Sequence, residues 1–445
     1  MTTTRWQGSA ANVRQQDTLV ITGTWATSDT ITLTCNNVTF VTTVGTLNTT
    51  TQVATTVTQA FTGTTLTDTA ASSNVAVADG GGVSIPVFAD ATATSSAGTV
   101  TFKGGLTTPA YLQGKPFTFT ASKSSASGVI TYSSAATAAA SQVHASIAAN
   151  FSGNAVLANN DTLVFDSGTI DMRYNLATYN SGSPVQLTAI TKYKAYTGNV
   201  GLRDIDQDTS SKPYSEYRTK YFTTNNNSVT TTANLEVGPG TGSGLFAWDA
   251  GAGQVVLSIF GQGTRIDTGV PCVLFKGTHA SNVINNLAGD LGVAFYGGEA
   301  ATIATVITGD GPNSSASTIL GSGCTLTTVT LNGGVKETNS AITTANQYGG
   351  TWTHKSGTVT TANIYGGTHY PNGSATYTTL NLYGGTFDAS KGTASFAVTN
   401  TIQMYKGSKY LDPGGRSGNA VFKLNGCAPS DVTIQFPDNK TYTLS

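Results

Sequence analysis

The amino-acid sequence predicts an all-β protein whose C-terminal part is a parallel β-helix (β-solenoid), preceded by a small β-rich N-terminal domain. Three observations lead to this prediction. Gly (51 of 445 residues) and Thr are abundant, apolar and polar residues alternate in short runs, and glycine pairs recur near the C-terminus. Thr favours strands, Gly favours tight turns, and alternation with a period of two is typical of half-buried strands. Repeats shorter than the common helical repeats, without a helical pattern, indicate a solenoid that adds strands turn by turn.

The chain carries little charge. Charged residues make up 10% of it, against about 25% in an average soluble domain, and the formal net charge is −1. Without a basic cluster, nothing favours binding to nucleic acid or to an anionic membrane. The N-terminus lacks the apolar core of a signal peptide and no apolar run spans a bilayer, so we expect synthesis in the cytoplasm without classical export. A surface poor in charge also suits dense assembly.

Residues 1–141 are predicted to form an attachment domain. Runs at 17–25 and 29–44 alternate like strands, the second with a hairpin turn at Asn36-Asn37, and two more strands are expected at 98–104 and 114–122. Between them, Val53, Val57, Ala60 and Phe61 recur at helical spacing, which predicts one short helix. The Ser- and Ala-rich run at 133–141 marks the expected boundary.

Residues 142–310 are predicted to form an irregular β-rich or solenoidal body. Strand-like runs at 159–172, 185–202, 230–240 and 253–263 are separated by Gly or Asn turns, and no helical pattern is convincing. Their spacing is too irregular to count a period, so the layout of the turns stays open.

Residues 311–445 are predicted to form regular turns of about 16–18 residues with Gly-Gly corners and a C-terminal cap. Glycine pairs begin at 297, 333, 349, 366 and 384, so the steps are 36, 16, 17 and 18 residues, and Lys406-Gly407 follows after 22. We interpret the first step as two turns of eighteen. A corner that needs positive φ explains the glycines.

Aligning the turns on their glycines exposes columns of equivalent residues. Two columns, two residues apart, should point into the core. Between them lies a column of amides that can bond to one another along the axis, and beside the glycines lies an outward column of tyrosines. The residues on which the alignment rests are Leu331, Ile364, Leu382 and Met404 (core), Asn346, Asn363 and Asn381 (amides), and Tyr348, Tyr365 and Tyr383 (tyrosines); it also places Val293, Ala294, Phe295 and Tyr296 in these columns.

The repeats, with the preceding run at 274–306, resemble bacteriophage-encoded β-helical virion structural proteins of the fibre, tailspike or decoration type. Serial Gly-Gly turns ending in an LDPGG-like segment, here Leu411–Gly415, carry this resemblance, together with the opening run at 2–34. The resemblance implies a parallel β-helix that commonly forms homotrimers. It brings no catalytic residue to any position of this chain.

The sequence offers few residues for chemistry. Glycoside hydrolysis needs two carboxylates roughly 5 to 10 Å apart, but Asp388 and Asp412 follow different corner phrases and are interpreted as local turn caps. Asp204, Asp206 and Asp208 alternate as a Ca²⁺ loop begins, yet the EF-hand pattern then fails. The four cysteines and four histidines show no zinc-ligand spacing. We expect no catalytic residue, no cofactor and no metal.

An aromatic strip is the remaining candidate site. Trp352, His354, His369, Tyr370 and Phe387 fall shortly after successive glycine pairs. On the surface they could bind sugars through their ring faces. The alternative is that such rings only stack to stabilise the solenoid.

The sequence therefore predicts a non-catalytic virion structural protein, a surface decoration or fibre component of head or tail. It would be a homotrimer that contacts other virion proteins through its N-terminal domain. One alternative is a receptor-binding tailspike that binds, and even cleaves, host surface carbohydrate. The other is a non-viral surface-layer protein or adhesin, which should carry an export signal.

Overall fold

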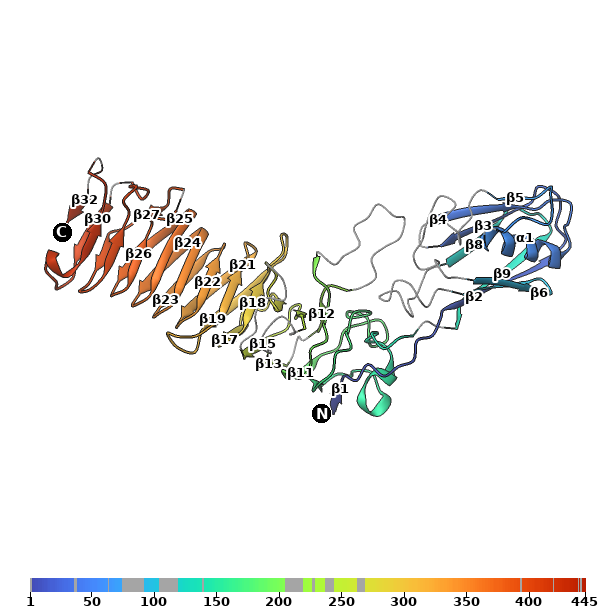
Figure 1. Ribbon diagram of the computed structural model, residues 1–445, viewed down its shortest axis with the longest axis horizontal. Helices are drawn as coiled ribbons and strands as arrows, with labels where there is room; N and C mark the ends of the chain where they lie inside the picture. The colour runs from blue at the N-terminus through green and yellow to red at the C-terminus, as the bar shows by residue number, and fades with distance from the viewer. Residues whose placement is uncertain are drawn as a thin grey trace. The chain divides into compact units, whose positions relative to one another are not determined.

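The computed structural model describes residues 2–35, 38–62, 64–73, 92–103, 119–137, 140–204, 219–225, 229–236, 244–261, 269–392, 394–418, 420–438, 440 and 442–445. The chain forms two compact units. Gly8–Asn150 makes one unit, and Phe151–Asp204 with Thr219–Ser445 makes the other, which also contains Met1–Gln7. Both units are rich in strands (Figure 1).

The N-terminal unit consists of two four-stranded antiparallel sheets and one helix. The sheets have the orders β6-β7-β2-β9 and β5-β4-β3-β8. The predicted hairpin is confirmed, since β3 pairs with β4 from Thr30↔Thr43 to Cys35↔Val38. The elements are β2 Gln16–Gly23, β3 Thr30–Cys35, β4 Val38–Thr43, α1 Thr50–Thr62, β5 Ser72–Ser73, β6 Thr92–Ser96, β7 Thr99–Lys103, β8 Phe119–Lys123 and β9 Gly128–Thr137.

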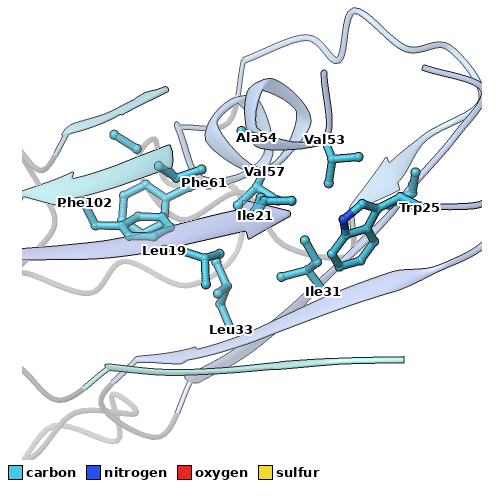
Figure 2. Packing of buried hydrophobic residues seen from close by; sticks show 13 residues of the cluster. Leu19, Ile21, Trp25, Ile31, Leu33, Val53, Ala54, Val57, Phe61 and Phe102 are labelled. Atoms are coloured by element: carbon cyan, nitrogen blue, oxygen red, sulfur yellow. The ribbon is translucent and has the colours of Figure 1, made fainter. Parts of the chain in front are cut away.

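The predicted short helix is confirmed as α1. Thr49 and Gln52 form a capping box at its start, because each side chain accepts the backbone N–H of the other, at 3.4 and 3.2 Å. Thr residues are poor helix formers, but here several hydroxyls donate to carbonyls one turn earlier, as Thr58 does to Ala54 O at 2.9 Å. The helix packs its apolar face on the core between the sheets. Figure 2 labels ten residues of this core: Leu19, Ile21, Trp25, Ile31, Leu33, Val53, Ala54, Val57, Phe61 and Phe102.

The second unit is a parallel β-solenoid with a 24-stranded sheet, as the glycine spacing predicts. Its strands pair with the equivalent strands of neighbouring turns and form two stacks. The first stack contains β1 Thr3–Arg5, β10 Asp161–Phe165, β11 Leu187–Lys192, β13 Thr231–Glu236, β15 Val255–Phe260, β17 Val283–Asn286, β19 Ala301–Thr308, β21 Cys324–Leu331, β23 Ile342–Gln347, β27 Ala397–Val398, β28 Ile402–Met404, β30 Ala420–Leu424 and β32 Tyr442–Leu444.

The second stack faces the first across the core. Two long strands, β24 Thr351–Ile364 and β25 Thr368–Leu382, belong to both stacks, because their first parts pair with β22 and β26 and their last parts with β23 and β28. The remaining strands of the second stack are β12 Phe222–Thr223, β14 Phe246–Asp249, β16 Val273–Lys276, β18 Asp290–Val293, β20 Ser317–Leu320, β22 Val335–Thr338, β26 Thr386–Asp388, β29 Lys409–Leu411 and β31 Thr433–Gln435. Short 3-10 turns lie at Ala148–Asn150, Ser152–Asn154 and Pro429–Asp431.

The glycine-pair corner joins the end of a first-stack strand to the start of a second-stack strand. Gly334, Gly350, Gly367 and Gly385 have φ of +77°, +68°, +73° and +64°. A Cβ added to Gly367 would lie 2.3 Å from the carbonyl oxygen of Gly350 in the turn before it. Glycine is therefore required both for its positive φ and for the close approach of successive turns.

The prediction that two turns of eighteen precede Gly333 is wrong. Thr308 pairs with Leu331, and Gly309 follows Thr308, so the corner before Gly333 begins at Gly309. Val293 pairs with Leu320 in the second stack, and Ala294, Phe295 and Tyr296 follow it there, so none of the four belongs to the predicted columns. Gly297-Gly298 lies in a loop where an added Cβ would meet nothing within 4 Å.

The solenoid also continues through the irregular region and includes the N-terminus. β1 pairs with β10 through Thr3↔Thr162, and β10 with β11 through Leu163↔Ile190. The period is irregular because segments of different length, such as those between β11 and β12 and between β15 and β16, are inserted at the same corner. The predicted boundary at 141 falls inside the N-terminal unit, which extends to Asn150.

Candidate functional surfaces

The predicted core column is confirmed. Leu331, Ile364, Leu382 and Met404 are at most 1% exposed. In the register, Leu331 pairs with Gln347, Gln347 with Ile364, Ile364 with Leu382, and Leu382 with Met404. Each side chain therefore lies on its equivalent of the turn before.

The amide column forms a hydrogen-bonded ladder on the outer face. Asn363 Nδ2 donates to Asn346 Oδ1 at 2.9 Å, and Asn381 Nδ2 donates to Asn363 Oδ1 at 2.8 Å. Asn425 Nδ2 also donates to Gln403 Oε1 at 2.9 Å, but from the position equivalent to Tyr405, since Gln403 pairs with Lys423. Asn363 at the centre of the ladder therefore uses one donor and one acceptor of its amide within the protein.

The tyrosines form a stack beside the glycine pairs. The ring centroids of Tyr348 and Tyr365 are 4.7 Å apart at 7°, those of Tyr365 and Tyr383 are 4.7 Å apart at 6°, and Tyr383 is 4.6 Å from Tyr405 at 26°. Tyr348, Tyr365 and Tyr383 are 52%, 41% and 37% exposed. Because each ring covers its neighbour's face, the inner rings offer solvent their edges and hydroxyls and no free face for a sugar.

The predicted aromatic strip does not lie on the surface. Trp352, His354, His369 and Phe387 are at most 1% exposed, so their predicted contact with a glycan is wrong. The run Thr351-Trp352-Thr353-His354 alternates along β24, with both threonines facing outward. Among the five predicted residues only Tyr370 is partly exposed, with the Lys391 ammonium 4.8 Å from its ring centroid.

These buried rings belong to a column of the second stack. Trp352 pairs with His369, His369 with Phe387, and Phe387 with Tyr410. His369 and Phe387 stack at 5.2 Å between ring centroids, and Phe387 and Tyr410 at 5.3 Å. The alternative interpretation, in which the rings stabilise the solenoid, is the one that the structure shows.

Buried polar groups of this region pair with one another. Thr338 Oγ1 accepts the Trp352 indole N–H at 2.9 Å and lies 2.6 Å from His354 Nδ1, while His354 Nε2 lies 3.2 Å from the carbonyl oxygen of Gly357. Since a carbonyl only accepts, His354 carries its proton on Nε2 and its Nδ1 accepts from Thr338. Burial lowers the pKa of His354 to about 4, so the ring is neutral at pH 7.

His369 has a similar environment. Its Nε2 lies 2.6 Å from the Tyr377 hydroxyl. Burial, and then the nearby His354, lower the pKa of His369 well below its usual value. Neither histidine reaches solvent, so neither can serve as a general base for an external substrate.

Lys336 is a buried lysine that the sequence analysis did not identify. It is fully buried one turn before Trp352, with which it pairs. Its Nζ donates to the carbonyl of Thr330 at 2.8 Å, and burial lowers its pKa well below the usual value. The sequence did carry a signal for this burial, because Lys336 lies two residues after a glycine pair. Trp352, His369 and Phe387 occupy the same position in later turns and all point inward.

The carboxylates serve local structure. Asp388 Oδ1 accepts the backbone N–H of Ser390, and the buried Asp412 accepts those of Arg416 and Ser417. Both are the turn caps that the sequence predicts. Asp204 forms an ion pair with Lys220, whereas Asp206 and Asp208 lie outside the described residues. The part of the chain that the structure describes holds no cluster of three or more metal-ligating side chains.

Two of the cysteines lie in the core. Cys272 and Cys324 are buried and unpaired, and Cys427 is unpaired and half-buried. Burial raises the pKa of the Cys272 and Cys324 thiols to about 12. They therefore remain protonated, unreactive side chains at neutral pH.

A polar hollow lies where the amide ladder is interrupted. Tyr377 pairs with Val398 and Asn381 with Gln403, so three residues of β25 oppose four residues of the next turn. Such a β-bulge bends the strand locally. The resulting hollow, of about 630 Å³, is lined by Thr379, Val398, Thr399, Asn400, Thr401, Gln403 and Val421, none of which is charged.

A second hollow lies on the second stack. It measures about 500 Å³, and Glu337 at its wall forms an ion pair with Lys355. The other lining residues are Gly269, Phe295, Ile319, Gly321, Ser322, Asn339 and Ser356.

No helix among the described residues has the length and hydropathy to cross a bilayer.

Neither a protein-family model, nor a curated protein, nor a solved structure matches the chain. The surfaces of this molecule therefore carry the functional argument.

Proposed function

We propose that the chain is a non-catalytic structural protein of a bacteriophage particle, a surface decoration or fibre component of head or tail. The observation that carries the proposal is the parallel ladder of 24 strands, in which core, amide and tyrosine columns repeat turn after turn. Such a body resists bending and local opening because each turn is hydrogen-bonded to both neighbours. The resemblance of the glycine-pair repeats and of the opening run to virion proteins supplies the biological setting.

The chemistry of the described surfaces supports a mechanical role. The buried histidines are neutral and enclosed, and the carboxylates at 388 and 412 cap turns. The N-terminal unit has a separate hydrophobic core, which suits a module that attaches the body to other virion proteins. We propose further that the protein is a homotrimer and that it resides in the virion.

Particle fractionation tests this function. Particles from a lysate that produces the chain would be separated on a density gradient and probed with an antibody against the purified protein. We expect the chain to sediment with intact particles, and gold labelling in the electron microscope to place it on head or tail. A chain that stays with the soluble proteins throughout would refute the virion proposal.

The polar hollow favours a second function, the binding of an uncharged host saccharide. Hydroxyls and amides of Thr399, Asn400 and Gln403 line it, and its volume lies within the usual range of ligand sites, about 300 to 1,000 Å³. A glycan array with the wild-type protein and with Asn400→Ala, which removes an exposed amide, tests this function. Binding that the variant loses would support it, and an array without hits would exclude it for the glycans printed.

A further inference from the structure

One edge of the solenoid gathers most of the exposed aromatic surface. The register places Asn332, Gly309, Leu287 and Phe260 at the position of Tyr348 in earlier turns, because each backbone N–H bonds to the residue before its equivalent. Before Phe260 the column continues through Glu236, its one charged member, to Tyr193. Eleven large hydrophobic side chains are exposed among the described residues. Five of them lie in this column, namely Tyr193, Phe260, Tyr348, Tyr365 and Tyr383. A sixth, Val335, lies just past the glycine pair.

Between Asn332 and Thr386 the residues that flank this column carry no charge, whereas at its C-terminal end Lys406 follows Tyr405 and Lys409 pairs with Thr386. On one side runs the amide ladder of Asn346, Asn363 and Asn381. On the other side, Val335 pairs with Thr351 and Thr351 with Thr368. Tyrosine is enriched at the centres of protein interfaces, and charged residues are depleted there. The edge therefore has the composition of an interface core with a polar rim.

We propose that this aromatic edge is the surface through which copies of the chain associate side by side, in parallel. The proposal rests on the homotrimeric fibre proposed above and names its contact surface. The tyrosine rings recur every 4.6 to 4.7 Å. A rigid partner matches that spacing over several turns only if it has the same repeat, and a second copy of this solenoid does.

The geometry of the edge is sufficient for such a contact. From Tyr193 to Tyr405 the column passes through nine steps of about 4.8 Å, which gives a length of about 43 Å. A stable interface buries about 800 Å² per partner, which requires a strip about 19 Å wide along this length. The tyrosine column with one column on either side spans about that width. If the copies are related by a rotation axis parallel to the solenoid axis, each residue lies at the same height as the same residue of the neighbouring copy. The tyrosine columns of the copies then align turn by turn.

Charge placed on this edge tests the inference. Val335 is 53% exposed and lies outside the tyrosine stack, so Val335→Glu leaves every ring contact in place while adding like charges between copies. Tyr365→Glu places the charge inside the stack. Thr360→Glu, at an exposed position elsewhere on β24, is the matched control. The measurement is mass by light scattering over a wide concentration range, with circular dichroism to verify the fold.

We expect the wild type and Thr360→Glu to have a multiple of the 45.6 kDa chain mass, and both edge variants to have the mass of one chain. If the wild type and all three variants associate equally, the edge is not the interface, although the fibre proposal stands. If the wild type is a single chain at every concentration, self-association fails as a whole, whereas particle fractionation still decides the virion function.

Discussion

The N-terminal unit and the solenoid are both built from strands, but they bury their side chains in different ways. In the N-terminal unit, Leu19 of β2, Phe61 of α1 and Phe102 of β7 meet in one core from distant parts of the chain. In the solenoid, Leu382 contacts the equivalent residues of the adjacent turns, Ile364 and Met404. We therefore expect the core of the N-terminal unit to unfold as one unit. The free energy of unfolding of the solenoid is instead a sum over neighbouring turns.

The largest expected effect is that of a charge in the solenoid core. Leu382→Asp places a carboxylate where no partner is available, and we expect a loss of about 5 kcal/mol or more. Calorimetry should show the solenoid transition abolished and the N-terminal transition retained. Thr360→Asp, on the exposed side of β24, should leave both transitions unchanged. A soluble, fully trimeric Leu382→Asp protein would contradict the column assignment.

Phe61→Ala tests the core of the N-terminal unit. The side chain is fully buried, and its ring lies 4.9 Å from that of Phe102, so its removal should cost about 3 to 5 kcal/mol. Only the N-terminal transition should move to lower temperature. Thr51→Ala, on the exposed side of α1, is the control. A shift of the solenoid transition instead would show that the two units do not unfold separately.

The solenoid holds two buried histidines, His354 and His369, and the N-terminal unit holds one, His144, whose pKa burial lowers to about 4, so acid should destabilise the solenoid more. Burial lowers the pKa of His354 in the folded protein to about 4, from its usual value of about 6.5. The unfolded chain therefore takes up protons first as the pH falls. Stability is fully present above pH 6.5 and declines between about 6.5 and 4, by about 3 kcal/mol for this residue.

Denaturant unfolding at pH 7 and pH 4.5 measures this decline. His369→Phe keeps an aromatic ring in the column but removes one titrating group, so the variant should lose less stability on acidification than the wild type. Equal losses in both proteins would show that His369 does not contribute. A solenoid that is as stable at pH 4.5 as at pH 7 would contradict the buried, neutral assignment of both rings.

The smallest of these effects concerns the corners. Gly367→Ala forces a Cβ to 2.3 Å from the Gly350 carbonyl oxygen at a φ of +73°, and we expect a loss of about 1 to 3 kcal/mol. Gly297→Ala is the matched control, because an added Cβ there would meet nothing within 4 Å. Thermal unfolding of both variants measures the difference. Equal stability of the two variants would remove the steric reason for the glycine-pair repeat.

Local pattern was sufficient to predict much of the fold. Apolar spacing located α1, and alternation located strands within the runs at 17–25, 29–44 and 253–263. The glycine period placed Leu382 inward, Asn381 in an amide ladder and Tyr383 in a stack. These features depend on residues one turn apart, which a single sequence displays directly.

Other features depend on which turn lies beside which. β1 joins the solenoid through a partner more than 150 residues away, and Gly309, not Gly297, marks the corner before Gly333. Sequence spacing does not distinguish a glycine in a loop from one in a corner. Only the packed turns, through the close approach at Gly333 and Gly334, distinguish them.

The candidate site shows the same division. Trp352 and His354 were expected on the surface, although the outward threonines that alternate with them already indicated the opposite face. The bulge at Thr399–Thr401 and the alignment of Phe260 with Tyr348 were not visible in the sequence. The repeat of a β-solenoid is encoded locally, because each strand pairs with the next copy of itself. The faces that this pairing exposes depend on the register of every turn, and register is a property of the assembled stack.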